Sequence, residues 1–163
     1  MALLIGMFLA LGVGLFAHLV GFDRDRAFYA TVLVIVGSYY VLFAVMGGGS
    51  GLTVELLFFA VFAALAVIGF RTSLWVVVAG LAGHGLFDFL RLGVLPGSGV
   101  PVWWPGFCGS YDVVAAAGLA VLLLLRKRRT VHAQGDSAGA VRGASGGAGY
   151  RRASNGPRPG AEV

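Results

Sequence analysis

Long apolar runs constrain the fold of this chain more than any other feature of its sequence. Five runs, each about 17 to 20 residues long, contain few charged side chains. A helix rises 1.5 Å per residue and the hydrocarbon core of a bilayer is about 30 Å thick, so each run can cross a membrane as a helix. Helices also satisfy their own backbone hydrogen bonds, which lipid cannot do. The sequence therefore predicts an all-α integral membrane protein.

We expect one bundle of five transmembrane helices within residues 1–129. The helices are expected at residues 2–20, 27–46, 52–70, 73–92 and 109–125. A glycine-rich run, 47–51, separates the second helix from the third. A loop rich in Pro, Gly and Trp, 95–108, is expected before the fifth, because proline cannot sustain a helix. With 58% hydrophobic and 12% charged residues, the composition excludes an ordinary water-soluble domain.

The C-terminal segment differs in character from the rest of the chain. It begins with four basic residues, 126–129, and continues through 130–163 with many Gly, Ala, Ser and Arg and few large apolar side chains. Such a composition buries too little surface to fold, so we predict that 130–163 are disordered. The net charge of +5 lies mostly beside this last apolar run. Anionic lipid headgroups are therefore the expected partner of the tail, and nucleic acid is not.

The distribution of Lys and Arg predicts the orientation in the cell membrane. Of the 12 Lys and Arg residues, all but Arg91 fall on the side of the membrane that carries the C-terminal tail. By the positive-inside rule, the N-terminus is then outside and the tail is cytoplasmic. His18, beside Arg24 and Arg26, is expected at the inner membrane interface.

Ionisable residues inside the predicted spans are the candidates for function, because they are costly in hydrocarbon. His84, Asp88 and Arg91 in the fourth span follow the spacing i, i+4 and i+7, which places them on one helix face. His84 lies about 16 Å along the helix from Ser73, close to the membrane midplane. Cys108 and Asp112 have the same i, i+4 spacing at the start of the fifth span.

The predicted orientation places these residues in the outer half of the membrane, together with polar residues from other spans. We interpret this group of residues as the lining of an outward-facing pocket. Four residues are predicted to be catalytic: Asp88, His84, Asp112 and Glu55. Six are predicted to bind a substrate: Tyr39, Tyr40, Arg91, Trp103, Trp104 and Cys108.

Structural interpretations stand beside these roles for the fourth and third spans. Asp88 and Arg91 are three residues apart and could form only a local ion pair near the headgroups. Glu55 lies in the first turn of its helix, where a carboxylate is stabilised by the helix dipole. His84 lies too deep to reach the interface, so its structural interpretation is a buried hydrogen bond, such as one to a carboxylate on another helix.

The fifth span has structural interpretations as well. Asp112 could be an N-terminal charge that follows Ser110, a helix-capping residue. A single buried cysteine such as Cys108 often serves as a small apolar side chain. Because Cys108 is the single cysteine of the sequence, an intramolecular disulfide and any site built from several cysteines of this chain are excluded.

Two segments carry a family resemblance. Residues 83–88 (GHGLFD) and 105–112 (PGFCGSYD) resemble small bacterial multi-pass membrane proteins of a domain-of-unknown-function family, which share H-x-x-W/F-D-x-x-H and a later C-x-x-x-D. The resemblance covers about 30 of the 163 residues and marks His84, Asp88, Cys108 and Asp112. It implies no particular activity. At Arg91 this chain departs from the second histidine of that pattern. A fixed cation disfavours a metal ion nearby, so we expect no metal and no cofactor.

Three classes of function are compatible with this sequence. The first is a membrane enzyme that binds and transforms a hydrophobic small molecule, such as an isoprenoid, by acid–base chemistry. Its chemistry would be similar to that of integral-membrane terpene cyclases, with aromatic rings stabilising a carbocation. The second is a proton or small-solute transport component, which with five helices would need to form a homo-oligomer. The third is a non-catalytic membrane subunit. The sequence contains no phosphate-binding loop, no H-E-x-x-H and no C-x-x-C.

Overall fold

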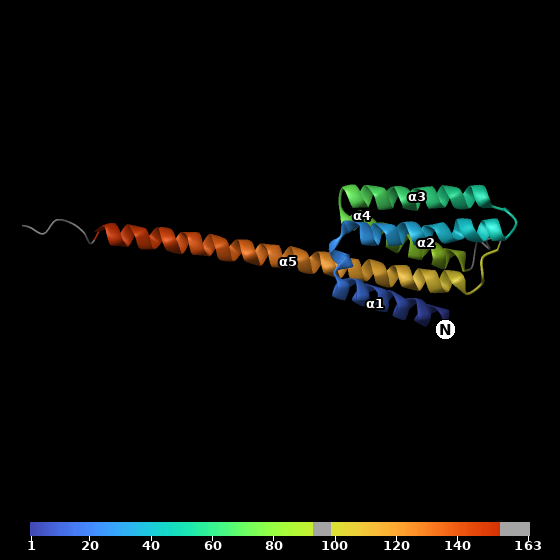
Figure 1. Cartoon of the computed structure of the whole chain (residues 1–163), viewed down its shortest axis with the longest axis horizontal. Coiled ribbons are helices and arrows are strands. Elements are labelled where there is room, and N and C mark those ends of the chain that lie inside the picture. The colour runs from blue at the N-terminus through green and yellow to red at the C-terminus, as the bar shows by residue number, and fades with distance from the viewer. Residues whose placement is uncertain (93–98, 154–163) are drawn as a thin grey trace, which may run out of the picture. The chain divides into compact units, whose positions relative to one another are not determined.

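The computed structural model describes residues 1–92 and 99–153, and of residues 129–153 it describes the backbone only. Its elements in chain order are α1 (Ala2–Val20), η1 (Phe22–Arg24), α2 (Arg26–Met46), α3 (Leu52–Arg71), α4 (Leu74–Arg91) and α5 (Trp104–Ala153), as Figure 1 shows. The described residues hold five helices long and apolar enough to cross a membrane, the fifth span being Trp104–Arg128, and they contain no strand. This confirms the predicted all-α class.

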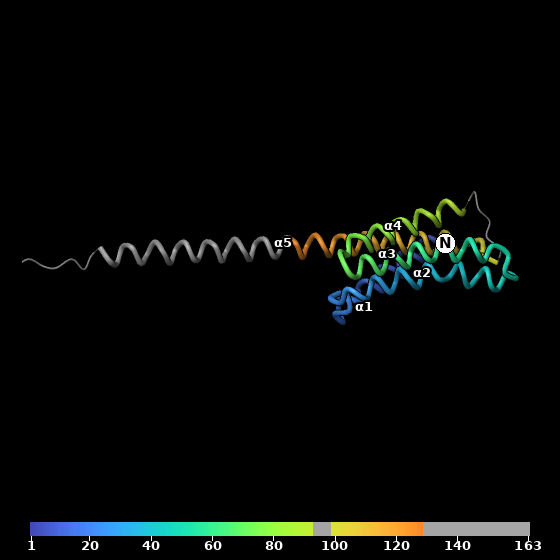
Figure 2. The backbone as a smooth tube through the Cα atoms, turned by 90° about the horizontal axis from the view of Figure 1, so that it is seen from above, coloured from blue at the N-terminus to red at the C-terminus, as the bar shows by residue number. Residues whose placement is uncertain are grey.

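The first four predicted spans agree with the structure to within one residue at each end. Side-chain caps explain where two of these helices begin. The Asp25 side chain accepts a hydrogen bond of 2.8 Å from the backbone N–H of Ala27 and begins α2. Ser73 Oγ accepts one of 3.3 Å from the N–H of Trp75 and begins α4. The short connections make consecutive helices from α1 to α4 antiparallel, and α3 packs beside both α2 and α4 (Figures 1 and 2).

The predicted start of the fifth span at residue 109 is wrong. Helix α5 begins at Trp104, so Pro105 lies in its first turn. Proline is accepted there because the first N–H groups of a helix have no intrahelical partner to lose. At its other end α5 extends to Ala153, past the predicted end at residue 125. The side chains from residue 129 onward lie outside the described part of the chain, and the disordered tail at 130–163 stays a prediction.

Residues 1–123 form a compact unit that contains the candidate site. Within it α2, α3 and α4 pack on one another. Helix α1 contacts α5, where Ser110 Oγ lies 2.9 Å from the backbone oxygen of Leu3. The core includes Leu33, Leu81 and Leu119, which are almost completely buried. Many other large apolar side chains are exposed on the outside of the unit, and Phe8, for example, is 67% exposed. Such an apolar outer surface suits contact with a lipid bilayer.

Glycines determine two features that position the site. The turn between α2 and α3 has positive φ at Gly48, Gly49 and Gly51, a conformation that other residues rarely adopt. This turn lies at the same end of the bundle as the end of α4 and the start of α5 (Figure 1). Helices α4 and α5 approach closely at Gly85 and Gly109, because a Cβ at Gly85 would lie only 3.0 Å from the backbone oxygen of Gly109.

Candidate functional site

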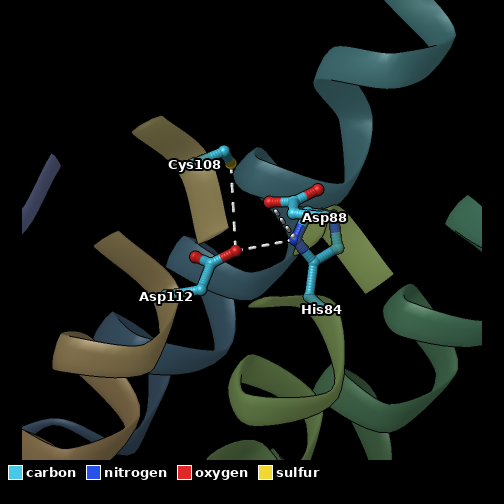
Figure 3. A group of neighbouring side chains, drawn as sticks. All are labelled: His84, Asp88, Cys108 and Asp112. Atoms are coloured by element: carbon cyan, nitrogen blue, oxygen red, sulfur yellow. Dashed lines mark hydrogen bonds and ion pairs between the residues drawn. The ribbon is translucent and has the colours of Figure 1, made fainter. Parts of the chain in front are cut away.

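Four side chains from two helices meet in the interior of this unit. Helix α4 contributes His84 and Asp88, and α5 contributes Cys108 and Asp112 (Figure 3). Each pair has i, i+4 spacing, which directs both members to the same side of their helix. Their relative exposures are 0 to 2%, so they lie out of contact with solvent. We call these four residues the buried cluster.

The imidazole of His84 lies between two carboxyl groups in the buried cluster. Its Nδ1 is 2.7 Å from Asp112 Oδ2 and 3.6 Å from Asp88 Oδ2. Cys108 Sγ lies 3.8 Å from the same Asp112 oxygen (Figure 3). With a proton on Nδ1, the imidazole donates a hydrogen bond to Asp112. The arrangement can therefore hold a proton between α4 and α5 and transfer it over a short distance.

Helices α2 and α3 complete the surroundings of the buried cluster. The Tyr40 hydroxyl donates a hydrogen bond of 2.6 Å to Asp88 Oδ1. The Phe62 ring contacts the imidazole of His84 edge to face, with 4.7 Å between ring centroids. These contacts restrain the Asp88 carboxyl and the His84 ring, and they bring every helix of the unit except α1 to the cluster.

Arg91 pairs with Glu55 and not with Asp88. Its guanidinium donates a hydrogen bond to Glu55 at the start of α3, and both groups are buried. The same guanidinium lies over the Tyr40 ring, 4.4 Å from its centroid. The local Asp88–Arg91 ion pair, one of the two interpretations of these residues, is therefore wrong, because Arg91 reaches across to α3.

The buried cluster offers four ligand atoms of different types to a metal ion. One nitrogen, one sulfur and two carboxylate oxygens all lie within 4.8 Å of one another. Among the described residues, Asp88 Oδ2 and Asp112 Oδ1 are buried without a hydrogen-bond partner. Native proteins usually satisfy such atoms, so each oxygen has capacity for a ligand or a water molecule.

Of the four predicted aromatic residues, Tyr40 contacts the buried cluster through Asp88, and the other three lie apart from it. Tyr39 packs against Trp104, with ring centroids 4.8 Å apart. Trp103 is 56% exposed and packs against Trp104 and Phe107. The structure therefore places Tyr40 and Cys108 at the cluster, Arg91 and Glu55 beside it, and the other three predicted aromatic residues apart from it.

An apolar cavity of about 240 Å³ lies next to the buried cluster, between α1, α2 and α5. Its lining includes Leu9, Val13, Val32, Ile35, Val36, Tyr39, Trp104, Phe107, Cys108 and Tyr111. Cys108 borders both the cavity and Asp112. Cys108 is the member of the buried cluster that lines the cavity, and it lies between the apolar space and Asp112.

Two details of the fifth span differ from the sequence interpretation. Asp112 lies in the third turn of α5 and not at its N-terminus, because the helix starts earlier than predicted. Ser110 does not cap the helix, since its Oγ lies 2.9 Å from the carbonyl oxygens of Leu3 and Phe107, to which a hydroxyl donates. Sequence analysis also missed Phe62, because an apolar residue in an apolar span carries no signal of its partner.

No family model matches this chain. Comparisons with curated proteins and with solved structures also give no match. The resemblance to the domain-of-unknown-function family therefore stays a hypothesis, which the geometry of His84, Asp88, Cys108 and Asp112 neither requires nor opposes.

Proposed function

We propose that this multi-pass membrane protein binds a hydrophobic small molecule in the apolar cavity and transforms it by acid–base chemistry at the buried cluster. The observation that carries the proposal is the position of Cys108, which borders both the cavity and Asp112. An apolar molecule dissolved in the bilayer can reach a cavity between helices without crossing water. Its reactive group would then lie against Cys108, the residue that separates the cavity from Asp112.

The reaction class supported by these groups is proton addition and removal on an apolar substrate. A protonated Asp112 donates its proton to one carbon of a double bond, whose π electrons form the new C–H bond and leave a carbocation. His84 then accepts a proton from a neighbouring carbon, and the electrons of that C–H bond form the shifted double bond. Tyr39 and Trp104 line the cavity and can stabilise the cation with their ring faces. An isoprenoid is a substrate of suitable chemistry for such an isomerisation or cyclisation.

The proposal also includes the orientation of the chain in the membrane. The asymmetry of Lys and Arg favours an external N-terminus and a cytoplasmic tail, with the basic residues 126–129 next to anionic lipid headgroups. In this orientation the site opens toward the outer leaflet.

Native mass spectrometry with lipid extraction tests the proposal on purified wild type and on Asp88→Asn and His84→Ala. We expect a specific apolar molecule to bind the wild type and to be lost from both variants. A second pair of variants tests the cavity. Ile35 lines the cavity and Ile68 does not, yet they are 49% and 50% exposed. Ile35→Trp should fill the cavity and reduce ligand binding, and Ile68→Trp should not.

The same measurement can also contradict the proposal. If wild type and variants fold alike and carry only bulk phospholipid, the ligand-binding proposal is wrong. Proton flux in liposomes then tests the transport hypothesis, which needs a homo-oligomer for a complete path.

A further inference from the structure

We infer that the buried cluster binds one divalent transition-metal ion of the zinc type. The ligands are His84 Nδ1, Cys108 Sγ and one oxygen each from Asp88 and Asp112. This inference goes beyond the proposed function and concerns the same buried site. Metal binding would occupy His84 and Asp112, so the metal-bound protein could hold the apolar molecule but would not carry out the proton transfer proposed above. The inference reverses the expectation from sequence that no metal is bound.

Two of the distances between ligand atoms match those around a tetrahedral ion. Zinc bonds to nitrogen, oxygen and sulfur are about 2.0 to 2.3 Å long, which separates tetrahedral ligands by about 3.3 to 3.8 Å. Asp88 Oδ2 is 3.6 Å from His84 Nδ1, and Cys108 Sγ is 3.8 Å from Asp112 Oδ2. The hydrogen bond of 2.7 Å between His84 and Asp112 must open by about 0.7 Å for both atoms to bind the ion.

A buried oxygen without a hydrogen bond gives further support for a ligand. Asp88 is completely buried, and its Oδ2 has no hydrogen-bond partner among the described residues. Figure 3 shows this carboxyl directed toward the His84 nitrogen and the centre of the cluster. A buried carboxylate oxygen without a partner is unfavourable, and a cation at this position would satisfy it.

Neighbouring residues prepare Asp88 for this role. Tyr40 donates its hydroxyl to the other oxygen of the same carboxyl group, Oδ1, and leaves Oδ2 facing the cluster. A hydrogen bond from a residue behind a metal ligand commonly orients that ligand. Tyr40 is therefore a positioning residue and not a ligand.

The charge balance also favours a dication. Two carboxyl groups share one imidazole inside a low-dielectric helical bundle. The sequence argued against a metal ion because Arg91 is a fixed cation close to the site. In the structure the Arg91 guanidinium pairs with Glu55 of α3, which offsets its charge. With the Cys108 thiol deprotonated, the ligands carry three negative charges. A dication would compensate two of them, while Arg91 and Glu55 compensate each other.

The ligand set indicates which metal ions fit. A thiolate and an imidazole select zinc, cobalt, nickel or iron over magnesium and calcium, which prefer oxygen ligands alone. Binding would displace the proton of the Cys108 thiol and the proton on His84 Nδ1. Both protons leave to solvent, and no change of oxidation state is involved.

The test uses full-length protein purified in detergent through an affinity tag without histidine. Zinc content is measured by elemental mass spectrometry, and cobalt(II) is then added to the metal-free protein and followed by absorption. We expect about one zinc or cobalt ion per chain, the stoichiometry of one closed four-ligand site. We also expect a sulfur-to-cobalt charge-transfer band in the near ultraviolet.

Variants assign the ligands. His84→Ala and Asp112→Asn should weaken zinc binding by more than about 100-fold, and Tyr40→Phe by about 10-fold, as for residues that orient a ligand. Cys108→Ser should lose the charge-transfer band while its melting temperature in the metal-free state stays unchanged. His18 is the matched control, because its Nδ1 lies 2.9 Å from Asp23 Oδ2 in a second histidine–carboxylate pair outside the cluster. His18→Ala should bind metal like wild type.

Two outcomes would overturn the inference. One is zinc and cobalt binding no tighter in wild type than in His84→Ala and Cys108→Ser. The other is bound cobalt with no thiolate band, which would indicate a site elsewhere. Loss of metal binding and loss of the apolar ligand are separate readouts. The inference fails with the proposed function intact if the apolar molecule binds specifically to a protein that never takes up metal. The proposed function fails with the inference intact if metal binds and no apolar molecule is found.

Discussion

His84 and Asp112 are 28 residues apart in the chain, and their side chains meet at 2.7 Å in the interior of the bundle. Each comes from a different helix, so their distance depends on how closely α4 approaches α5. That approach is set by Gly85 and Gly109, where a side chain on either residue would press against the backbone of the other helix. The geometry of the site is therefore linked to two residues that carry no functional group.

We predict that Gly85→Ala disturbs the site more than Gly83→Ala. The new methyl group at Gly85 would meet the Gly109 carbonyl and Val113 at 3.0 Å, whereas a methyl group at Gly83 would have no heavy atom within 4 Å. Overpacking of this kind costs about 1 to 3 kcal/mol. Thermal unfolding in detergent should show a lower melting temperature for Gly85→Ala only. Equal melting temperatures for both variants would contradict the close contact between α4 and α5.

Replacing Tyr40 by Phe should destabilise the protein by about 1 to 3 kcal/mol, because Asp88 Oδ1 then loses its hydrogen-bond donor inside the bundle. Tyr39→Phe is the matched control, since Tyr39 packs against Trp104 beside the cavity and that ring contact is retained. Denaturation in detergent compares the two variants. A loss no larger for Tyr40→Phe than for Tyr39→Phe would argue against the Tyr40–Asp88 hydrogen bond.

Arg91 and Glu55 should behave as a coupled pair in a double-mutant cycle. Arg91→Met or Glu55→Gln alone leaves one charged partner buried, which costs about 3 to 5 kcal/mol. The double variant should recover much of this loss, because no uncompensated charge remains. Unfolding free energies of the four proteins give the coupling. Additive effects would mean that the two side chains do not interact.

Reporter fusions test the proposed orientation. Green fluorescent protein joined after Arg129 should be fluorescent, and alkaline phosphatase at the same position should be inactive, because the tail is expected in the cytoplasm. The same reporters inserted at the turn 47–51 should give the opposite pattern. An active phosphatase after Arg129 would show that the orientation is reversed.

Sequence reasoning predicted the all-helical class of the protein and the bounds of its first four apolar helices. Apolar runs of the right length define spans, because lipid imposes helices on any segment that crosses it. The i, i+4 spacings of His84 with Asp88 and of Cys108 with Asp112 likewise follow from helix geometry alone. The predicted start of α5 is wrong because proline breaks a helix in its interior but is accepted in its first turn, where Pro105 lies.

Only the tertiary structure decided which polar groups meet. A run that is apolar on all sides does not reveal how its helix is rotated, so the sequence could not choose between Asp88 and Glu55 as the partner of Arg91. The fold directs Arg91 to Glu55 and leaves Asp88 to Tyr40 and the buried cluster. The physical reason is that contacts such as Gly85 with Gly109 set the helix rotation, and these depend on surfaces distant in the chain.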